Sequence, residues 1–184
     1  LTDESPDGTI PLTDLLEQTL ADLMSEGLIL DATIARSTTQ RAAMWARREA
    51  AAELGAAVKP MIDSDIAVPL DQVETFLSRI APRIAAIAPG AETLTVAHLG
   101  DGNLHYSVYP GDPSEAMYDR VIEAIEDVVQ SLGGSFSAEH GVGLSKLNSM
   151  SRRKDAVALD LMRTIKAAVD PQNLMNPGKV IPPK

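Results

Sequence analysis

The sequence predicts an α+β fold with a mostly antiparallel sheet flanked by helices. Segments of alternating apolar and polar residues, which suit strands, are interleaved with segments whose apolar residues recur every three or four positions, which suit helices. Two strand-like segments are separated only by a short loop containing Asp101-Gly102, so they should pair as an antiparallel hairpin. The other connections form no regular strand–helix–strand series, which argues against a parallel sheet.

The predicted elements of the first half follow from capping residues and apolar spacing. They are a polar loop over residues 1–10, a helix capped by Thr13 and stopped at Gly27, a strand over residues 28–35, an Ala-rich helix from Ser37 to Leu54, an extended segment over residues 60–69, and a helix over residues 70–87. Pro82 lies inside the last of these helices, where a proline removes one backbone hydrogen bond, so we expect a kink there.

The second half is predicted in the same way. Its elements are strands over residues 93–98 and 104–109, a helix capped by Ser114 and ended by Gly133-Gly134, a short extended segment over residues 135–138, a helix over residues 153–169, and a Pro-rich tail over residues 170–184.

The composition limits the classes of function. With 184 residues, 45% of them hydrophobic, the chain is long enough for one domain or two small ones. Its 26 acidic and 16 basic residues give a net charge of −10, which argues against nucleic-acid binding, since affinity for phosphates needs clustered Lys and Arg. No segment approaches the roughly 20 apolar residues of a membrane span. The absence of Cys excludes disulfides and thiolate sites, and it fits a cytoplasmic location.

Two of the three histidines flank the predicted hairpin turn. If Asp101-Gly102 forms a two-residue turn, His98 lies directly opposite His105 on one face of the sheet. Opposed residues have Cβ atoms about 4.5–5.5 Å apart, which lets two imidazoles reach one metal ion. The alternative is a pair of strand histidines that only satisfy their own hydrogen bonds.

A carboxylate and the third histidine are adjacent in Glu139-His140, before a loop with two glycines. They can supply a third metal ligand and a proton acceptor, because two His and one carboxylate leave coordination positions open for a substrate. The alternative is a solvated strand end. Taken alone, Arg48 beside Trp45 is interpreted as part of a solvated basic helix face, and residues 176–179 as a plain turn.

Taken together, the motifs resemble the C-terminal portion of FAD-linked oxidases of the vanillyl-alcohol-oxidase type. The matching segments are residues 45–49, 65–69, 98–105, 139–143, 170–171 and 176–179, in this order. The members that are most similar in pattern are the D-lactate, glycolate and D-2-hydroxyglutarate dehydrogenases. The resemblance implies that residues 1–184 form a ferredoxin-like substrate- and metal-binding cap whose N-terminal FAD-binding domain is absent here. Residues 1–10 would then be a loop after a truncated strand, and residues 170–184 a tail approaching the flavin.

The same resemblance implies a reaction and a set of residue roles. The reaction is oxidation of a D-2-hydroxy acid to the 2-oxo acid by an oxidoreductase with FAD as hydride acceptor. His98, His105 and Glu139 are the implied ligands of a divalent metal, zinc first, with manganese and iron as alternatives. His140 is implied as the base that takes the hydroxyl proton.

Four further residues receive roles by resemblance. Arg48 would pair with the substrate carboxylate, which suits a bidentate guanidinium, and Ser107 would lie at the carboxylate end of the substrate. Asn176 and Lys179 would approach the flavin. The cap alone is expected to be inactive, its exposed sheet edge can pair with another copy as a homodimer, and its electron acceptor is not identified.

Two positions depart from the pattern of the family. Where many relatives have Lys, this chain has Asp63, and where the 2-hydroxyglutarate enzymes have Asn, it has Ser107. Both changes argue against a dicarboxylate substrate. Two other classes of function stay open: a metal-dependent hydrolase or lyase that uses His98, His105 and Glu139, and a non-catalytic α+β interaction module in which the histidines are structural.

Overall fold

The computed structural model describes residues 7–57, 60–98, 100–112 and 114–183, and the chain divides into two compact units, Leu1–Glu53 and Leu54–Lys184. The first unit contains helix α1 (Leu12–Ser25) and most of helix α2 (Thr38–Ala57). Among the described residues, no helix is long and apolar enough to span a bilayer.

The predicted strand over residues 28–35 is wrong. Residues 28–35 form neither strand nor helix, and the side chains of Leu28 and Leu30 are 66% and 97% exposed. An alternating pattern yields a strand only where a neighbouring strand takes up its backbone hydrogen bonds, and no described strand pairs with this segment.

The helix starts in this unit differ in how they are capped. Helix α1 begins at Leu12, one residue before the predicted cap Thr13, and Pro11 precedes it without a side-chain cap. The prediction that Ser37 opens α2 is confirmed, because the Ser37 hydroxyl accepts a hydrogen bond from the Gln40 backbone N–H at 3.2 Å.

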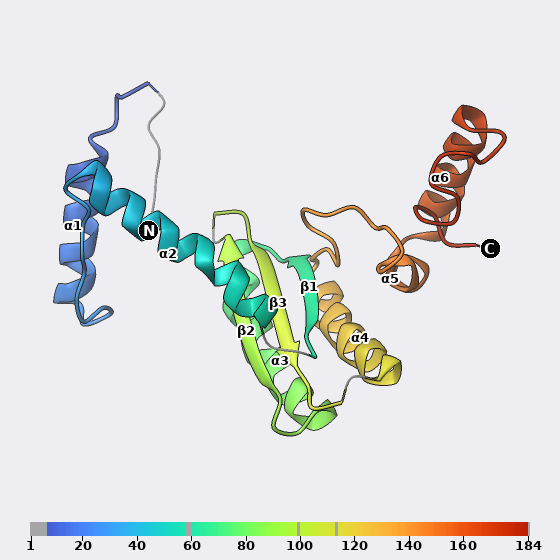
Figure 1. The fold of residues 1–184 in the computed structure, drawn as a ribbon, viewed down its shortest axis with the longest axis horizontal. Helices are drawn as coiled ribbons and strands as arrows, with labels where there is room; N and C mark the ends of the chain where they lie inside the picture. The colour runs from blue at the N-terminus through green and yellow to red at the C-terminus, as the bar shows by residue number, and fades with distance from the viewer. Residues whose placement is uncertain (1–6, 58–59, 99, 113, 184) are drawn as a thin grey trace. The chain divides into compact units, whose positions relative to one another are not determined.

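The second unit has the predicted α+β architecture. Its elements are β1 (Ile62–Ala67), the short 3₁₀-helix η1 (Leu70–Gln72), α3 (Val73–Ile87), β2 (Glu92–His98), β3 (Asn103–Tyr109), α4 (Glu115–Ser131), α5 (Leu147–Arg153) and α6 (Ala156–Val169). The three strands form an antiparallel sheet in the order β1-β3-β2, with α3 and α4 against one face (Figure 1).

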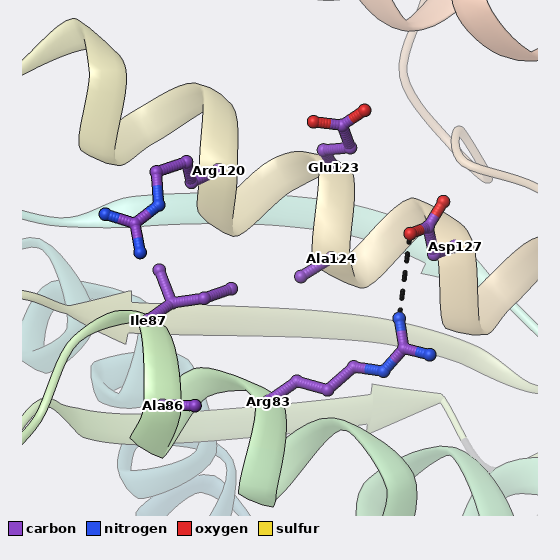
Figure 2. Close-up of a pocket in the computed structure, with 7 residues that line it drawn as sticks. All are labelled: Arg83, Ala86, Ile87, Arg120, Glu123, Ala124 and Asp127. Atoms are coloured by element: carbon purple, nitrogen blue, oxygen red, sulfur yellow. Dashed lines mark ion pairs between the residues drawn. The ribbon is translucent and has the colours of Figure 1, made fainter.

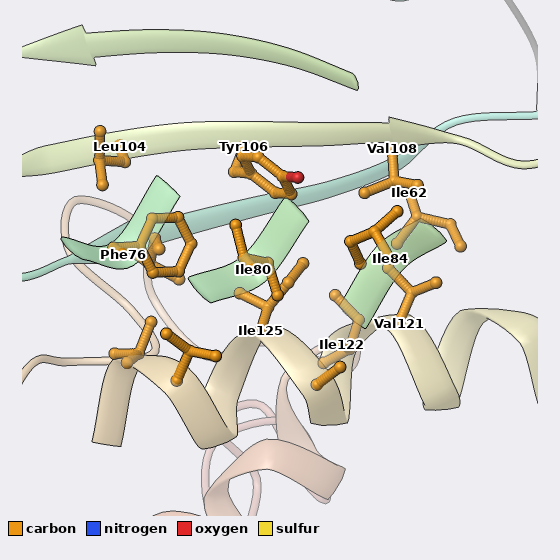
Figure 3. Close-up of a cluster of buried hydrophobic side chains, with 14 of the residues drawn as sticks. Ile62, Phe76, Ile80, Ile84, Leu104, Tyr106, Val108, Val121, Ile122 and Ile125 are labelled. Atoms are coloured by element: carbon orange, nitrogen blue, oxygen red, sulfur yellow. The ribbon is translucent and has the colours of Figure 1, made fainter. Parts of the chain in front are cut away.

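The hydrophobic core lies between this face of the sheet and the two helices (Figure 3). Strand residues Ile66, Leu104 and Val108 are fully buried there. The rings of Phe76 on α3 and Tyr106 on β3 meet edge to face, with centroids 5.6 Å apart. Because side chains alternate across a strand, the residues between these positions point to the opposite face of the sheet.

The last predicted helix is two helices. It was expected over residues 153–169, but α5 ends at Arg153 and α6 starts at Ala156. Lys154 is extended, and the Asp155 side chain accepts a hydrogen bond from the Ala158 backbone N–H. This N-cap starts a new helix, whereas a single helix would leave Asp155 in its interior.

Gly134 lies where two segments of the backbone approach each other closely. Ala67 of β1 and Ser135 exchange two backbone hydrogen bonds of 3.0 and 2.8 Å. A Cβ atom added to Gly134 would lie 2.3 Å from the Ala67 carbonyl oxygen. Only glycine fits between the two backbones at this position. The two hydrogen bonds attach the segment after α4 to the edge of β1.

We therefore expect Gly134→Ala to lower the free energy of unfolding by about 1–3 kcal/mol, the usual cost of overpacking. Gly111→Ala is the matched control, because nothing lies within 4 Å of an added Cβ there, and its effect should stay within about 0.5 kcal/mol. Urea denaturation of the 184-residue chain measures both. Equal effects of the two substitutions would contradict the close approach.

Candidate metal centre

The β2–β3 hairpin places His98 and His105 on the same face of the sheet, opposite the hydrophobic core. Their rings are 5.6 Å apart between centroids. The predicted direct pairing is wrong, because His98 pairs with Asn103 and His105 pairs with Val96. The two histidines are therefore diagonal neighbours, and since the shift is an even number of residues, both stay on the predicted face.

The turn explains this difference in register. A two-residue type I′ turn needs positive φ at both central residues. Gly102 has φ +75°, but Asp101 is not in the left-handed region. Instead, β2 ends at His98 and β3 begins at Asn103, and the Asp101 side chain accepts a hydrogen bond from the Asn103 backbone N–H at 3.0 Å. The longer loop has no room for a side chain at position 102. A Cβ atom added to Gly102 would lie 2.0 Å from the Val68 carbonyl oxygen.

Glu139 completes a group of three metal-binding side chains with the two histidines. Its Oε1 lies 3.1 Å from His98 Nε2 and 3.7 Å from His105 Nε2. One ligand atom from each of the three side chains lies within 4.8 Å of the others. Glu139 comes from the loop after α4, and it lies 41 positions after His98 and 34 positions after His105 in the sequence.

The geometry of this group fits a divalent metal. Two ligand atoms that are each about 2.0–2.1 Å from a tetrahedral zinc ion lie roughly 3.3 Å from each other, and the two measured distances of 3.1 and 3.7 Å lie on either side of this value. The side chains of His98, His105 and Glu139 are 40%, 25% and 46% exposed, respectively. An ion held by them would keep positions open toward a ligand from outside.

The Asp65 carboxylate of β1 holds the loop that carries Glu139. It accepts hydrogen bonds from the backbone N–H groups of Ala138, Glu139 and His140, at 3.3, 3.1 and 3.0 Å to Oδ2. Lys146 Nζ also lies 3.2 Å from the same oxygen. Asp65 is the strand partner of His105, so it connects the strand of one ligand with the loop of another.

Asn103 donates a hydrogen bond to the other oxygen of this carboxylate. Its Nδ2 donates to Asp65 Oδ1 at 2.9 Å and to the Ile66 carbonyl at 3.0 Å, which fixes the orientation of the amide. Its Oδ1 is buried and accepts no hydrogen bond within the described part of the chain. Sequence reasoning missed Asp65, Lys146 and Asn103 as site residues. The available signal was a carboxylate at an interior position of a predicted buried strand.

The pKa of Asp65 reflects these contacts. Burial alone would raise the pKa, but the hydrogen bonds from the His140 backbone, Lys146 and Asn103, with the Lys146 charge, lower it far below its usual value of 3.8. A carboxylate whose folded-state pKa is depressed stabilises the fold above the usual pKa. That contribution is lost as the pH falls through the lower value.

We expect Asp65→Asn to lower the free energy of unfolding at pH 7 by about 2–3 kcal/mol, as for hydrogen bonds to a charged group. The difference from the wild type should be constant above about pH 5 and shrink below about pH 4. Urea denaturation at several pH values measures this. Asp71→Asn changes an exposed carboxylate on η1 and serves as the control. A pH-independent effect of Asp65→Asn would contradict the assignment.

The other predicted site residues lie in different places. The His140 ring is exposed, and its centroid is 6.5 Å from that of His105, beside the group of metal-binding side chains. Ser107 lies on the same face of the sheet, and its hydroxyl donates to Asp63 Oδ1 at 2.8 Å. Arg48 belongs to the first unit, where its guanidinium lies 5.4 Å from the centre of the Trp45 ring. The structure thus places His140 beside the three metal-binding side chains, and Ser107 on the same face of the sheet as His105. The role of Arg48 stays a prediction.

The predicted flavin contacts lie in a turn after α6. Asn176 has φ +48°, and its carbonyl oxygen accepts a hydrogen bond from the Lys179 backbone N–H at 3.2 Å. Asp170 organises the approach to this turn, since its carboxylate accepts from the backbone N–H groups of Leu174 and Met175 and contacts Lys166. No hydrogen bond or ion pair joins Asn176 or Lys179 to the histidines in the described part of the chain, and their roles also stay predictions.

A groove of about 420 Å³ lies elsewhere, between α3 and α4 (Figure 2). Arg83 and Asp127 form an ion pair of 3.6 Å across it, and Arg120 projects from α4 beside Ile87. The groove is on the side of the helices, whereas the histidines occupy the opposite face of the sheet. It therefore contributes nothing to the candidate metal centre.

The sequence is similar to that of several known proteins. A D-2-hydroxyglutarate dehydrogenase of Xanthomonas citri is 33% identical over 162 residues, which are 85% of this chain and 34% of that protein. The mitochondrial D-2-hydroxyglutarate dehydrogenase of Rattus norvegicus is 33% identical over 175 residues, 93% of this chain and 31% of the relative. A probable D-2-hydroxyglutarate dehydrogenase of Oryza sativa subsp. indica is 31% identical over 167 residues, 91% of this chain and 29% of the relative.

The chain thus spans about a third of the length of these relatives. The family described as FAD linked oxidases, C-terminal domain, matches residues 6–180, which is nearly the whole sequence. On this match, the chain belongs to the FAD-linked oxidases and corresponds to their C-terminal domain.

Proposed function

We propose that this chain is the metal- and substrate-binding part of an FAD-dependent dehydrogenase that oxidises a D-2-hydroxy acid to the 2-oxo acid. One observation carries the proposal: His98, His105 and Glu139 converge within 4.8 Å on a sheet face that His140 also approaches. The names of the relatives, which are D-2-hydroxyglutarate dehydrogenases, support the class of reaction.

A metal ion and a flavin would supply the chemistry that side chains cannot. A divalent metal held by His98, His105 and Glu139 would act as a Lewis acid toward substrate oxygens, and FAD would accept a hydride. The donor atoms of both imidazoles and of the carboxylate already lie close enough together to bind one ion. The mixture of two nitrogen donors and one oxygen suits zinc, manganese or iron.

The protein's own part in the reaction is to orient the substrate and to move one proton. Oxidation of the alcohol breaks the O–H bond and the C–H bond at C2, and the O–H proton needs an acceptor. We assign that role to His140, because imidazole accepts protons near neutral pH and its ring lies beside that of His105. Its backbone is fixed at both ends, by Asp65 at its N–H and by the Ser137 hydroxyl at its carbonyl oxygen.

The far end of the substrate is proposed to meet Asp63 and Ser107. Asp63 lies on β1 two residues before Asp65, and Ser107 lies on β3 two residues after His105, so both share the face of the metal-binding group. Asp63 is exposed and its carboxylate is bonded to Ser107. A negative charge at this point repels a second carboxylate. The proposed substrate is therefore a 2-hydroxy acid with an uncharged tail rather than a dicarboxylate.

We expect the purified chain to bind close to one zinc ion, and His105→Ala and Glu139→Gln each to lose it, because each removes one of three ligands. Inductively coupled plasma mass spectrometry after dialysis gives the metal content. Glu123→Gln, which changes an exposed carboxylate on α4, is the matched control and should retain the metal. Retention of the metal by Glu139→Gln would overturn the assigned ligand set, and an absence of metal from all samples would favour structural histidines.

We expect a protein that carries this chain and an FAD-binding domain to have a higher kcat/KM for D-lactate than for D-2-hydroxyglutarate. Asp63→Asn should shift the ratio toward D-2-hydroxyglutarate by about thirtyfold, since two like charges about 8 Å apart repel each other by about 2 kcal/mol near a protein surface. Asp71→Asn, on η1, is the control. Dye reduction under anaerobic conditions measures both rates. An unchanged ratio in Asp63→Asn would contradict the proposed position of the substrate tail, and a colourless protein without activity would favour a hydrolase or lyase.

A further inference from the structure

We infer that Lys146 and Asp65 are positioning residues for the metal ligand Glu139, and that they determine the metal affinity of the centre without contacting the metal themselves. The inference rests on the metal site of the proposed function. It adds two residues to that site, neither of which donates a ligand atom in the cluster of His98, His105 and Glu139.

The loop that carries Glu139 has no regular secondary structure. Residues 136–142 form no helix or strand, so their own backbone does not fix the direction in which Glu139 points. Three consecutive N–H groups of this loop, at residues 138–140, converge on the single carboxylate of Asp65. The Ala138 N–H also lies 3.2 Å from the Asp65 backbone carbonyl oxygen. The loop is thus attached to β1 at the ligand residue and at both of its neighbours.

Asp65 connects this loop to the sheet. Asp65 and His105 are Cα partners in the β1–β3 ladder, so the carboxylate lies on the same face as the His105 ring and next to it. Asp65 is 5% exposed, so a shift of its side chain would leave a buried charge without its hydrogen-bond partners. The strand that carries one metal ligand therefore sets the position of the loop that carries another.

Lys146 connects Asp65 with the loop through two contacts. Its ammonium lies 3.2 Å from Asp65 Oδ2 and donates to the Ser137 hydroxyl at 2.8 Å. That hydroxyl in turn donates to the His140 carbonyl oxygen at 2.7 Å. Lys146 is thus bonded to β1 at Asp65 and to the loop at Ser137, and its side chain is only 18% exposed. The Lys146 ammonium balances the charge of the Asp65 carboxylate, and through the Ser137 hydroxyl it also holds the His140 carbonyl.

The alternative is that the network only stabilises the fold. The two roles differ in what they predict for a folded variant. A purely structural network changes the free energy of unfolding and leaves metal affinity unchanged once the chain is folded. A positioning network changes metal affinity in the folded chain, by about 10–100-fold for residues that orient metal ligands.

The test measures the affinity of the 184-residue chain for Zn²⁺ by competition with a chromophoric chelator, and the visible spectrum of bound Co²⁺ as a report on coordination geometry. Lys146→Met is expected to weaken Zn²⁺ binding about 10–100-fold and to change the Co²⁺ spectrum. Lys146→Arg should recover part of the affinity, because it restores the charge. Lys154→Met is the matched control, since Lys154 is exposed at the end of α5, and it should bind as the wild type does.

A milder variant and a second measurement keep the test decisive if Lys146→Met does not fold. Ser137→Ala removes only the hydroxyl between Lys146 and the His140 carbonyl, and a several-fold loss of affinity is expected. Amide hydrogen exchange at residues 138–140, measured by NMR without metal, should be faster in either variant than in the wild type.

The outcomes separate the inference from the proposed function. If the wild type binds Zn²⁺ and the folded Lys146→Met and Ser137→Ala variants bind it equally well, the inference is overturned and the metal site stands. If the wild type binds no Zn²⁺, the metal site itself is overturned, and the inference with it. Faster amide exchange combined with lost affinity in Lys146→Met, and neither effect in Lys154→Met, supports the inference.

Discussion

The carboxylate of Asp65 connects the two parts of the candidate metal centre. One part, the pair of histidines, belongs to a regular hairpin, and the other, Glu139 with His140, belongs to an irregular loop. Asp65 lies in the sheet and accepts hydrogen bonds from three backbone N–H groups of that loop. Without such a partner these N–H groups would be satisfied by water, and the loop would have no fixed position against the strands. The buried charge is tolerated because it is surrounded by donors and lies beside the Lys146 ammonium.

The two faces of the sheet carry different kinds of side chain. Its inner face carries Ile66, Leu104 and Val108 and buries them against α3 and α4. Its outer face carries polar side chains at the alternate positions of the same strands, among them Asp65 and His105. This division lets the outer face change its chemistry without disturbing the core, because alternate residues of one strand share no packing.

Family membership and the candidate site rest on different observations. The match to FAD-linked oxidases covers residues 6–180 and follows from the sequence as a whole. The site rests on a few distances among three side chains and on the network beneath them. These two observations agree in one respect, since the residues that the resemblance assigns as ligands are the ones that converge. The two observations differ on the proposed substrate. The relatives are named for 2-hydroxyglutarate, a dicarboxylate, whereas this chain presents the carboxylate of Asp63 on the proposed substrate face.

The sequence by itself determined the α+β class, the helix capped by Ser114, the three strands of the sheet and the shared face of the two hairpin histidines. These features depend on local spacing and capping, which a linear pattern records directly. Only the tertiary structure decided the hairpin register, the break between α5 and α6, and the absence of a strand over residues 28–35. Each of these depends on a hydrogen-bond partner outside the pattern: the Asp101 side chain in the turn, the Asp155 cap, and a neighbouring strand that residues 28–35 do not have. The role of Asp65 belongs to the same class. Its partners in the loop lie more than 70 positions away along the chain, and no local pattern records a contact over that distance.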